Sequence, residues 1–309
     1  MDIDSKIGPS IDGTYLTELP GAFGELRRSD DVQDDVDALR ERMVGDGYLY
    51  LPGLLDTTRV AAARDAMLEQ LDRLGCLDPA ARRVEGQVRS GKPAVNTVAI
   101  ANGVPEVFQL LYEAEMMSFW ARFLGDSVRH FDFTWFRNGT AGRNTPPHCD
   151  TVYMGRGTPD LYTTWTPLMD VPYELGGLMI LENSHTREDL LADYWTNDVD
   201  TYCETKPTAA ENAANLPAWR ADKSAGIFDP DTIKLQSRFK QRWLSTEFQA
   251  GDILTFGMHT LHASADNHTS RFRLSTDSRY QLASEPADER WIGAAPVGHG
   301  ANAKKGMIC

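Results

Sequence analysis

The sequence is short of basic residues, since 31 Lys and Arg stand against 45 Asp and Glu and the formal net charge is −14. Such a surplus of negative charge repels a phosphate backbone, which argues against nucleic acid as a partner. No run of residues approaches the ~18 consecutive apolar residues that a membrane-spanning helix needs. The first residues, MDIDSKIGPSIDG, are acidic and polar, unlike a secretory signal. We therefore expect a protein that acts without nucleic acid and without a membrane.

Cysteine is also scarce, and the four cysteines are widely spaced: Cys76, Cys149, Cys203 and Cys309. The absence of any C-x-x-C pair argues against a zinc knuckle, and the wide spacing argues against a disulfide framework. We expect four reduced thiols and a cytoplasmic location.

What remains is an ordinary globular composition, 41% hydrophobic and 25% charged, in a length that suits one elaborated domain. Residues 1–30 are rich in Gly, Pro, Ser and Asp and predict an extended arm, and residues 31–125 predict a helical flank. Residues 126–283 contain regular short β-type runs, which favour a β-sandwich or barrel core. A polar stretch with spaced aromatics, 187–240, interrupts them and is interpreted as a lid. Residues 284–309 form a tail.

Within the helical flank, capping residues and apolar spacing predict individual elements. Ser29 is a candidate cap for a helix over roughly 31–45, and Asp56 for a second helix. The run GYLYLPGLL, 47–55, predicts a strand between them. Apolar residues over about 105–124 predict a third helix.

The segment Pro146 to Asp150, PPHCD, is the first that could carry chemistry. In a strand, residues i and i+2 project from the same face, so His148 and Asp150 can turn toward one metal ion. With one more histidine they would form the 2-His-1-carboxylate triad of non-heme iron(II), which leaves coordination positions open. An isolated H-x-D is a weak signal, because it is common by chance.

The segment after GDILTF, 251–256, offers the missing ligand and a further cation. His259 and His262 follow that strand-like run, and their odd offset places them on opposite faces of an extended chain. Arg273 stands eleven residues beyond His262. A guanidinium can hold a carboxylate through two hydrogen bonds, which suits the distal carboxylate of 2-oxoglutarate.

The chain contains H-x-D, then a distal histidine, then an arginine. With its motifs in this order, the chain resembles the phytanoyl-CoA dioxygenase family of iron(II)/2-oxoglutarate-dependent oxygenases. The resemblance rests on PPHCDTVYMG, YTTWTPLMDVPYELGGLMILENSH and GDILTFGMHTLHASADNHTSRFRLSTDSR, and more weakly on DGYLYLPGLLD. It is most similar in character to bacterial secondary-metabolite hydroxylases, including those that act on pentalenolactone-type terpenoid acids. The resemblance implies a mainly β fold, a cupin-like double-stranded β-helix (jelly roll).

The resemblance also implies roles for individual residues. His148, Asp150 and His262 match the iron ligands, and Arg273 matches the clamp on 2-oxoglutarate. The family pattern thus favours His262 over His259.

Other matched positions surround the cosubstrate. Ser264 is expected to assist the clamp, Trp165 to line the pocket, and Tyr153 to point inward nearby. Arg279 is expected to form an ion pair with Asp277 or another carboxylate, or to take part in catalysis.

The implied reaction uses iron(II), 2-oxoglutarate and O2 to oxidise an unactivated C–H bond of a small molecule. Related halogenases replace the carboxylate ligand by Gly or Ala, so an intact Asp150 favours hydroxylation, while desaturation, epoxidation and ring closure stay open. Three alternatives remain: an acyl-CoA hydroxylase of the same family, a catalytically silent jelly-roll binding protein, and a zinc hydrolase.

We expect a monomer or homodimer. Cys149 is expected to be core filler, and three further histidines to be surface or satisfied polar residues: His130, His268 and His299.

Overall fold

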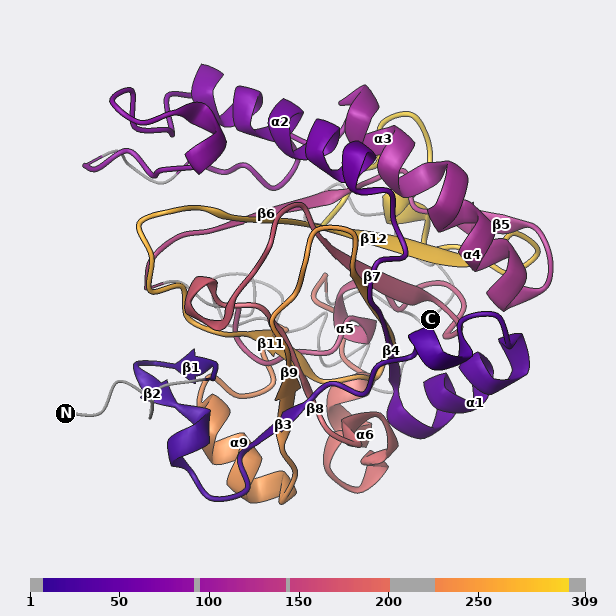
Figure 1. The fold of residues 1–309 in the computed structure, drawn as a ribbon. Coiled ribbons are helices and arrows are strands. Elements are labelled where there is room, and N and C mark those ends of the chain that lie inside the picture. Colours follow the sequence, from indigo (N-terminus) through magenta and orange to yellow (C-terminus); the bar gives the residue numbers. More distant parts are fainter. Residues whose placement is uncertain (1–7, 92–94, 143–144, 201–225, 300–309) are drawn as a thin grey trace.

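The computed structural model describes residues 8–91, 95–142, 145–200 and 226–299. Its core is a double-stranded β-helix of two facing sheets (Figure 1). The six-stranded sheet has the order β4 (Tyr48–Leu51), β10 (Ile253–Gly257), β7 (Tyr162–Pro167), β12 (Arg273–Leu282) and β5 (Val128–His130), with β6 (Trp135–Gly139) also paired to β12. The four-stranded sheet has the order β11 (His262–Ser264), β8 (Leu178–Leu181), β9 (Trp243–Ser245) and β3 (Phe23–Glu25). A small hairpin, β1 (Ser10–Ile11) and β2 (Thr14–Tyr15), precedes them.

Four helices in the first part of the chain cover the outer face of the six-stranded sheet: α1 (Val36–Asp46), α2 (Thr57–Arg73), α3 (Pro105–Tyr112) and α4 (Ala114–Leu124). In Figure 1, α2, α3 and α4 lie along one side of the molecule, over β6 and β12. Two sequence predictions are wrong here. The first helix is capped by Asp35 instead of Ser29, because the chain forms a 3-10 turn at 30–32 first. The third helix is two helices, because the backbone at Glu113 is extended.

The cap predicted at Asp56 is confirmed, since its carboxylate accepts hydrogen bonds from the amides of Thr58 and Arg59. The predicted strand over 47–55 is shorter, β4 being four residues long.

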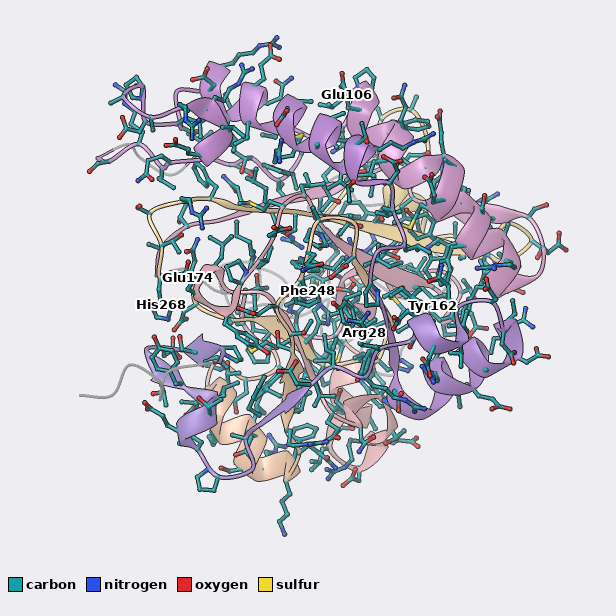
Figure 2. The ribbon with its side chains drawn as sticks, viewed as in Figure 1. Arg28, Glu106, Tyr162, Glu174, Phe248 and His268 are labelled. Atoms are coloured by element: carbon teal, nitrogen blue, oxygen red, sulfur yellow. The ribbon has the colours of Figure 1, made fainter. Side chains whose placement is uncertain are left out.

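Side chains alternate along the strands between two hydrophobic cores. The outer core lies between the six-stranded sheet and the helices, and the inner core lies between the two sheets. On β4, Leu49 and Leu51 pack with the helices, whereas Tyr48 and Tyr50 pack between the sheets. This period of two is expected for a sheet that is covered on both faces. Phe248, in the inner core, lies near the middle of the molecule in Figure 2.

The strand β12 sets out the site by the same alternation. Leu274 and Tyr280 belong to the outer core, while Arg273, Asp277 and Arg279 line cavities inside the β-helix. The sequence motif R-x-S-x-D-x-R therefore places its charged residues along one inner face.

The insertion over 187–240 includes two described helices, α6 (Glu188–Trp195) and α9 (Thr232–Phe239). Trp219, predicted to belong to a lid, falls outside the described residues. Trp195 packs beside the core and its ring stacks on His259 at 4.4 Å. Among the described residues, no helix has both the length and the apolar character to cross a membrane. The division into arm, flank, core and tail remains a prediction.

Candidate active site

Three residues that are far apart in sequence converge inside the β-helix. One possible ligand atom from each of His148, Asp150 and His262 lies within 4.8 Å of the others, and all three residues are buried. The Nε2 atoms of His148 and His262 lie 3.7 and 3.8 Å from Oδ1 of Asp150. The arrangement has the donor set of the 2-His-1-carboxylate triad.

The backbone explains how H-x-D converges with the distal histidine. His148 and His262 form an antiparallel bridge, each amide donating to the other's carbonyl at 3.0 Å. Asp150 departs from the predicted strand, because its backbone is helical and leads into α5 (Thr151–Met154). The chain therefore turns just after His148, and this turn brings the carboxylate beside both imidazoles.

Carbonyl groups fix the orientation of the two imidazoles. Nδ1 of His148 lies 2.8 Å from the carbonyl oxygen of Pro146, and Nδ1 of His262 lies 3.0 Å from that of Thr260. Because a carbonyl only accepts, each Nδ1 carries the proton and each Nε2 keeps its lone pair for a metal. Burial lowers the pKa of His148 to about 3 and also lowers the pKa of His262, which keeps both rings neutral.

The two carboxylate oxygens of Asp150 have different surroundings. Its Oδ2 accepts hydrogen bonds from Nη2 of Arg279 at 2.9 Å and from the Thr163 hydroxyl, which leaves Oδ1 toward the imidazoles. Burial would raise the pKa of Asp150, but the charge of Arg279 and the hydrogen bond from the Thr163 hydroxyl hold it below its usual range. Thr163 and Arg279 are paired across β7 and β12, so one register supplies both donors.

A first cavity extends from the triad to Arg273. Nη1 of Arg273 donates to the carbonyl of Gly176, while its Nε is buried without a partner among the described residues. Burial lowers the pKa of Arg273 to about 10. Gly139 makes room for this guanidinium, because a Cβ at that position would lie 3.2 Å from its Cζ. A buried cation with an unpaired donor is suited to an incoming carboxylate.

Two of the other residues predicted to surround the cosubstrate line this first cavity. Ser264 accepts a hydrogen bond from the amide of Thr145 at 2.6 Å, and Trp165 stacks edge-on with Phe248 on the inner face of β7. Tyr153 lines a second cavity instead, with its ring 5.4 Å from that of His148.

The second cavity encloses about 820 Å³ when the solvent at its mouth is counted, and it shares His148 and Asp150 with the first. Apolar side chains form much of its wall: Val98, Trp135, Pro146, Met154 and Ile227. Ile227 comes from the 187–240 insertion, so a described part of that insertion borders the site. His299 also lines this cavity; it is exposed and paired with Asp200, as expected for a surface or satisfied polar residue, but its place at the cavity was not predicted.

A network of buried ion pairs holds the C-terminal segment, and with it His299, against the second cavity. Nδ1 of His299 lies 2.9 Å from Oδ2 of Asp200, which also pairs with Arg290 at 2.7 Å. Arg290 further pairs with Asp198 and Asp288. Sequence reasoning missed this network, because no spacing along the chain relates residues near 198 to residues near 290.

The remaining candidates lie apart from the triad. His259 stacks on Trp195, and the Cys149 thiol donates to the carbonyl of His259 at 3.4 Å, so neither faces the cluster. Burial raises the pKa of Cys149, as expected for core filler. His130 stacks on Tyr112 outside the site.

The predicted ion pair of Arg279 is present, but its partner is Asp150. Asp277 pairs instead with Arg137.

Comparison with known proteins distinguishes an iron-dependent oxygenase from the alternative functions of this site. A model of the phytanoyl-CoA dioxygenase family matches residues 43–275. The chain belongs to this family. Its members' fold and the triad together make it an iron(II)- and 2-oxoglutarate-dependent oxygenase. The resemblance inferred from PPHCD and the later segments is thereby confirmed.

Similar individual proteins agree in fold and in sequence. The 1-deoxypentalenic acid 11-beta-hydroxylase of Streptomyces exfoliatus is 28% identical over 264 residues, which cover 81% of this chain and 83% of the relative. Among solved structures, the epimerase SnoN in complex with Fe3+, alpha ketoglutarate and nogalamycin RO has a TM-score of 0.55 at 21% identity, covering 89% of this chain and 95% of that one. EctD from S. alaskensis, solved with 2-oxoglutarate and 5-hydroxyectoine, has a TM-score of 0.55 at 17% identity, covering 100% and 98%.

The residues present fit both groups that this family uses. His148, Asp150 and His262 would hold iron(II), and the orphaned Nε of Arg273 fits the distal carboxylate of 2-oxoglutarate. Iron and 2-oxoglutarate together supply the activation of dioxygen, with 2-oxoglutarate converted to succinate and carbon dioxide. Arg279 and Thr163 orient the carboxylate ligand, and the two carbonyls orient the imidazoles.

Proposed function

We propose that this enzyme hydroxylates an unactivated C–H bond of a small organic molecule in secondary-metabolite biosynthesis. The observation that carries the proposal is a pair of cavities that share four lining residues, Arg137, Thr145, His148 and Asp150. The first cavity leads to Arg273 and suits 2-oxoglutarate. The second is larger and bordered by apolar and aromatic side chains, which suits a partly apolar substrate.

Two further observations favour hydroxylation. Asp150 occupies the carboxylate position that halogenases leave open, and it is held there by Arg279 and Thr163. The relative from Streptomyces exfoliatus is a hydroxylase of 1-deoxypentalenic acid, a terpenoid acid of secondary metabolism.

An acyl-CoA substrate is less well supported. The basic residues that could bind its phosphates are Lys234, Arg238, Lys240 and Arg242. Among these, Arg242 pairs with Glu182, and Arg238 lies over the ring of Phe228. None of the four lines either cavity that contains the triad residues.

The test uses oxygen isotopes. Purified enzyme is incubated with iron(II), 2-oxoglutarate and ¹⁸O2, first with 1-deoxypentalenic acid and then with a bacterial metabolite extract. We expect succinate and a hydroxylated product in equal amounts, with one ¹⁸O atom in each. Water-derived oxygen in the product, or turnover with zinc and without 2-oxoglutarate, would indicate a hydrolase instead.

We also propose that the enzyme acts in the cytoplasm as a monomer or homodimer, without nucleic acid or a membrane. The net charge of −14 argues against a nucleic-acid partner, and the widely spaced cysteines are typical of a reducing compartment. Size-exclusion chromatography with light scattering measures the oligomeric state directly.

A further inference from the structure

The guanidinium of Arg137 lies where the two cavities meet. Arg137 is on β6 and lines both the first and the second cavity. Its Nε donates to Oδ2 of Asp277 at 2.7 Å, and 33% of its side chain is exposed. Asp277 is its sole hydrogen-bond partner among the described residues. Neither terminal nitrogen of Arg137 has a hydrogen-bond partner in the described part of the chain, while the Asp277 contact fixes the plane of the guanidinium.

The charged side chains that line the two cavities have a net charge of +1. Among the described residues, three guanidinium groups and two carboxylates line them: Arg137, Arg273, Arg279, Asp150 and Asp277. Iron(II) and the dianion of 2-oxoglutarate bring equal and opposite charges. The histidines of the triad bring no charge, since each Nδ1–H faces a carbonyl and each Nε2 keeps its lone pair for the metal. A loaded site therefore carries one uncompensated positive charge, which is costly once a substrate excludes water.

We propose that the substrate carries a carboxylate, and that Arg137 binds it through both terminal nitrogens. This inference rests on the proposed function and names the substrate class. An organic monoanion would neutralise the loaded site, and the paired N–H groups of a guanidinium match the two oxygens of a carboxylate. The remainder of the substrate would lie against Val98, Trp135 and Met154.

Arg137 is the residue for this role, because the other two guanidinium groups are buried, with only 5% of Arg273 and 2% of Arg279 exposed. Nη2 of Arg279 binds Asp150, and its guanidinium lies 4.1 Å from the ring centre of Trp135. Its Nε and Nη1 have no hydrogen-bond partner among the described residues but are closed to solvent. Arg273 is at the far end of the first cavity and does not line the second. A substrate in the second cavity meets Arg137 alone as an accessible cation of the described chain.

The test uses benzoate and its uncharged isostere benzamide as probes of the second cavity. Enzyme loaded anaerobically with iron(II) and 2-oxoglutarate is titrated with each, and binding is followed by calorimetry and by the iron–2-oxoglutarate charge-transfer band. We expect benzoate to bind at least about tenfold more tightly than benzamide, with the band retained. Three outcomes would each overturn the proposal: equal affinities for the two probes, no binding of benzoate, or displacement of 2-oxoglutarate by benzoate. All three are measured on the wild-type enzyme.

Variants assign the preference to one side chain. Arg137→Gln should abolish the preference for benzoate, and Arg137→Lys, which keeps the charge beside Asp277, should retain only part of it. Arg129→Gln, at an exposed arginine on the adjacent β5, removes the same charge and should leave the preference intact. Loss of 2-oxoglutarate binding in Arg137→Lys would instead assign Arg137 to the cosubstrate. Failure of the wild-type enzyme to form the iron–2-oxoglutarate complex would defeat the proposed function itself.

Discussion

Replacing Arg273 by Lys tests how the enzyme holds 2-oxoglutarate. Nη1 of Arg273 is already used by the carbonyl of Gly176, so Nε and Nη2 remain to bind the distal carboxylate side-on. Lysine keeps a positive charge but has no Nε–H, so one of the two charge-assisted hydrogen bonds is lost. Such a bond contributes about 1.5–3 kcal/mol, which corresponds to an apparent KM for 2-oxoglutarate raised by roughly 10- to 150-fold.

The assay measures succinate release against 2-oxoglutarate concentration, with iron content determined in parallel. We expect a large rise in KM, a smaller change in kcat and full retention of iron, because Arg273 contacts none of the three ligands. Arg271→Lys is the matched control, since Arg271 lies just before β12 and lines neither cavity. An unchanged KM in Arg273→Lys would refute the reasoning and move the clamp to another arginine.

Three further predictions follow from the same geometry. His262→Ala should weaken iron binding by more than about 100-fold, whereas His259→Ala should leave it nearly intact, as measured by iron titration; the reverse pattern would exchange their roles. Gly139→Ala, whose Cβ would press on the Arg273 guanidinium, should raise the KM for 2-oxoglutarate by about three- to tenfold, whereas Gly257→Ala, with open space around it, should not. Limited proteolysis within 187–240 should be suppressed only when iron, 2-oxoglutarate and substrate are all present, because that insertion contributes to the second cavity; equal cleavage with and without ligands would contradict the lid hypothesis.

The ligand motifs were predictable from sequence because they depend on local chemistry. The order of residue types is specific: H-x-D is followed by a distal histidine and, eleven residues later, by an arginine. Few sites other than an iron and 2-oxoglutarate site need these residue types in that order. The alternation of R-x-S-x-D-x-R could also have indicated that Arg273, Asp277 and Arg279 share one face of a strand. Which carboxylate Arg279 would meet was not predictable, because Asp150 reaches it only through the turn into α5 and the register of β7 with β12.

Other features depended on tertiary structure that no periodicity encodes. Tyr153 was placed beside the cosubstrate, yet α5 directs it to the second cavity. His299 had no partner at useful spacing, yet its contact with Asp200 places it at the same cavity. The break at Glu113 lies inside a continuous apolar pattern, so the two helices were taken as one.

The most direct test of the central claim is an anaerobic titration of the enzyme with iron(II) and 2-oxoglutarate, followed by absorption spectroscopy. We expect one iron per chain and a charge-transfer band that appears only when both are present. The same titration of His148→Ala should show neither tight iron binding nor the band, although the protein remains folded. A wild-type enzyme without the band, or a His148→Ala variant that keeps it, would contradict the assignment of His148, Asp150 and His262 as the iron site.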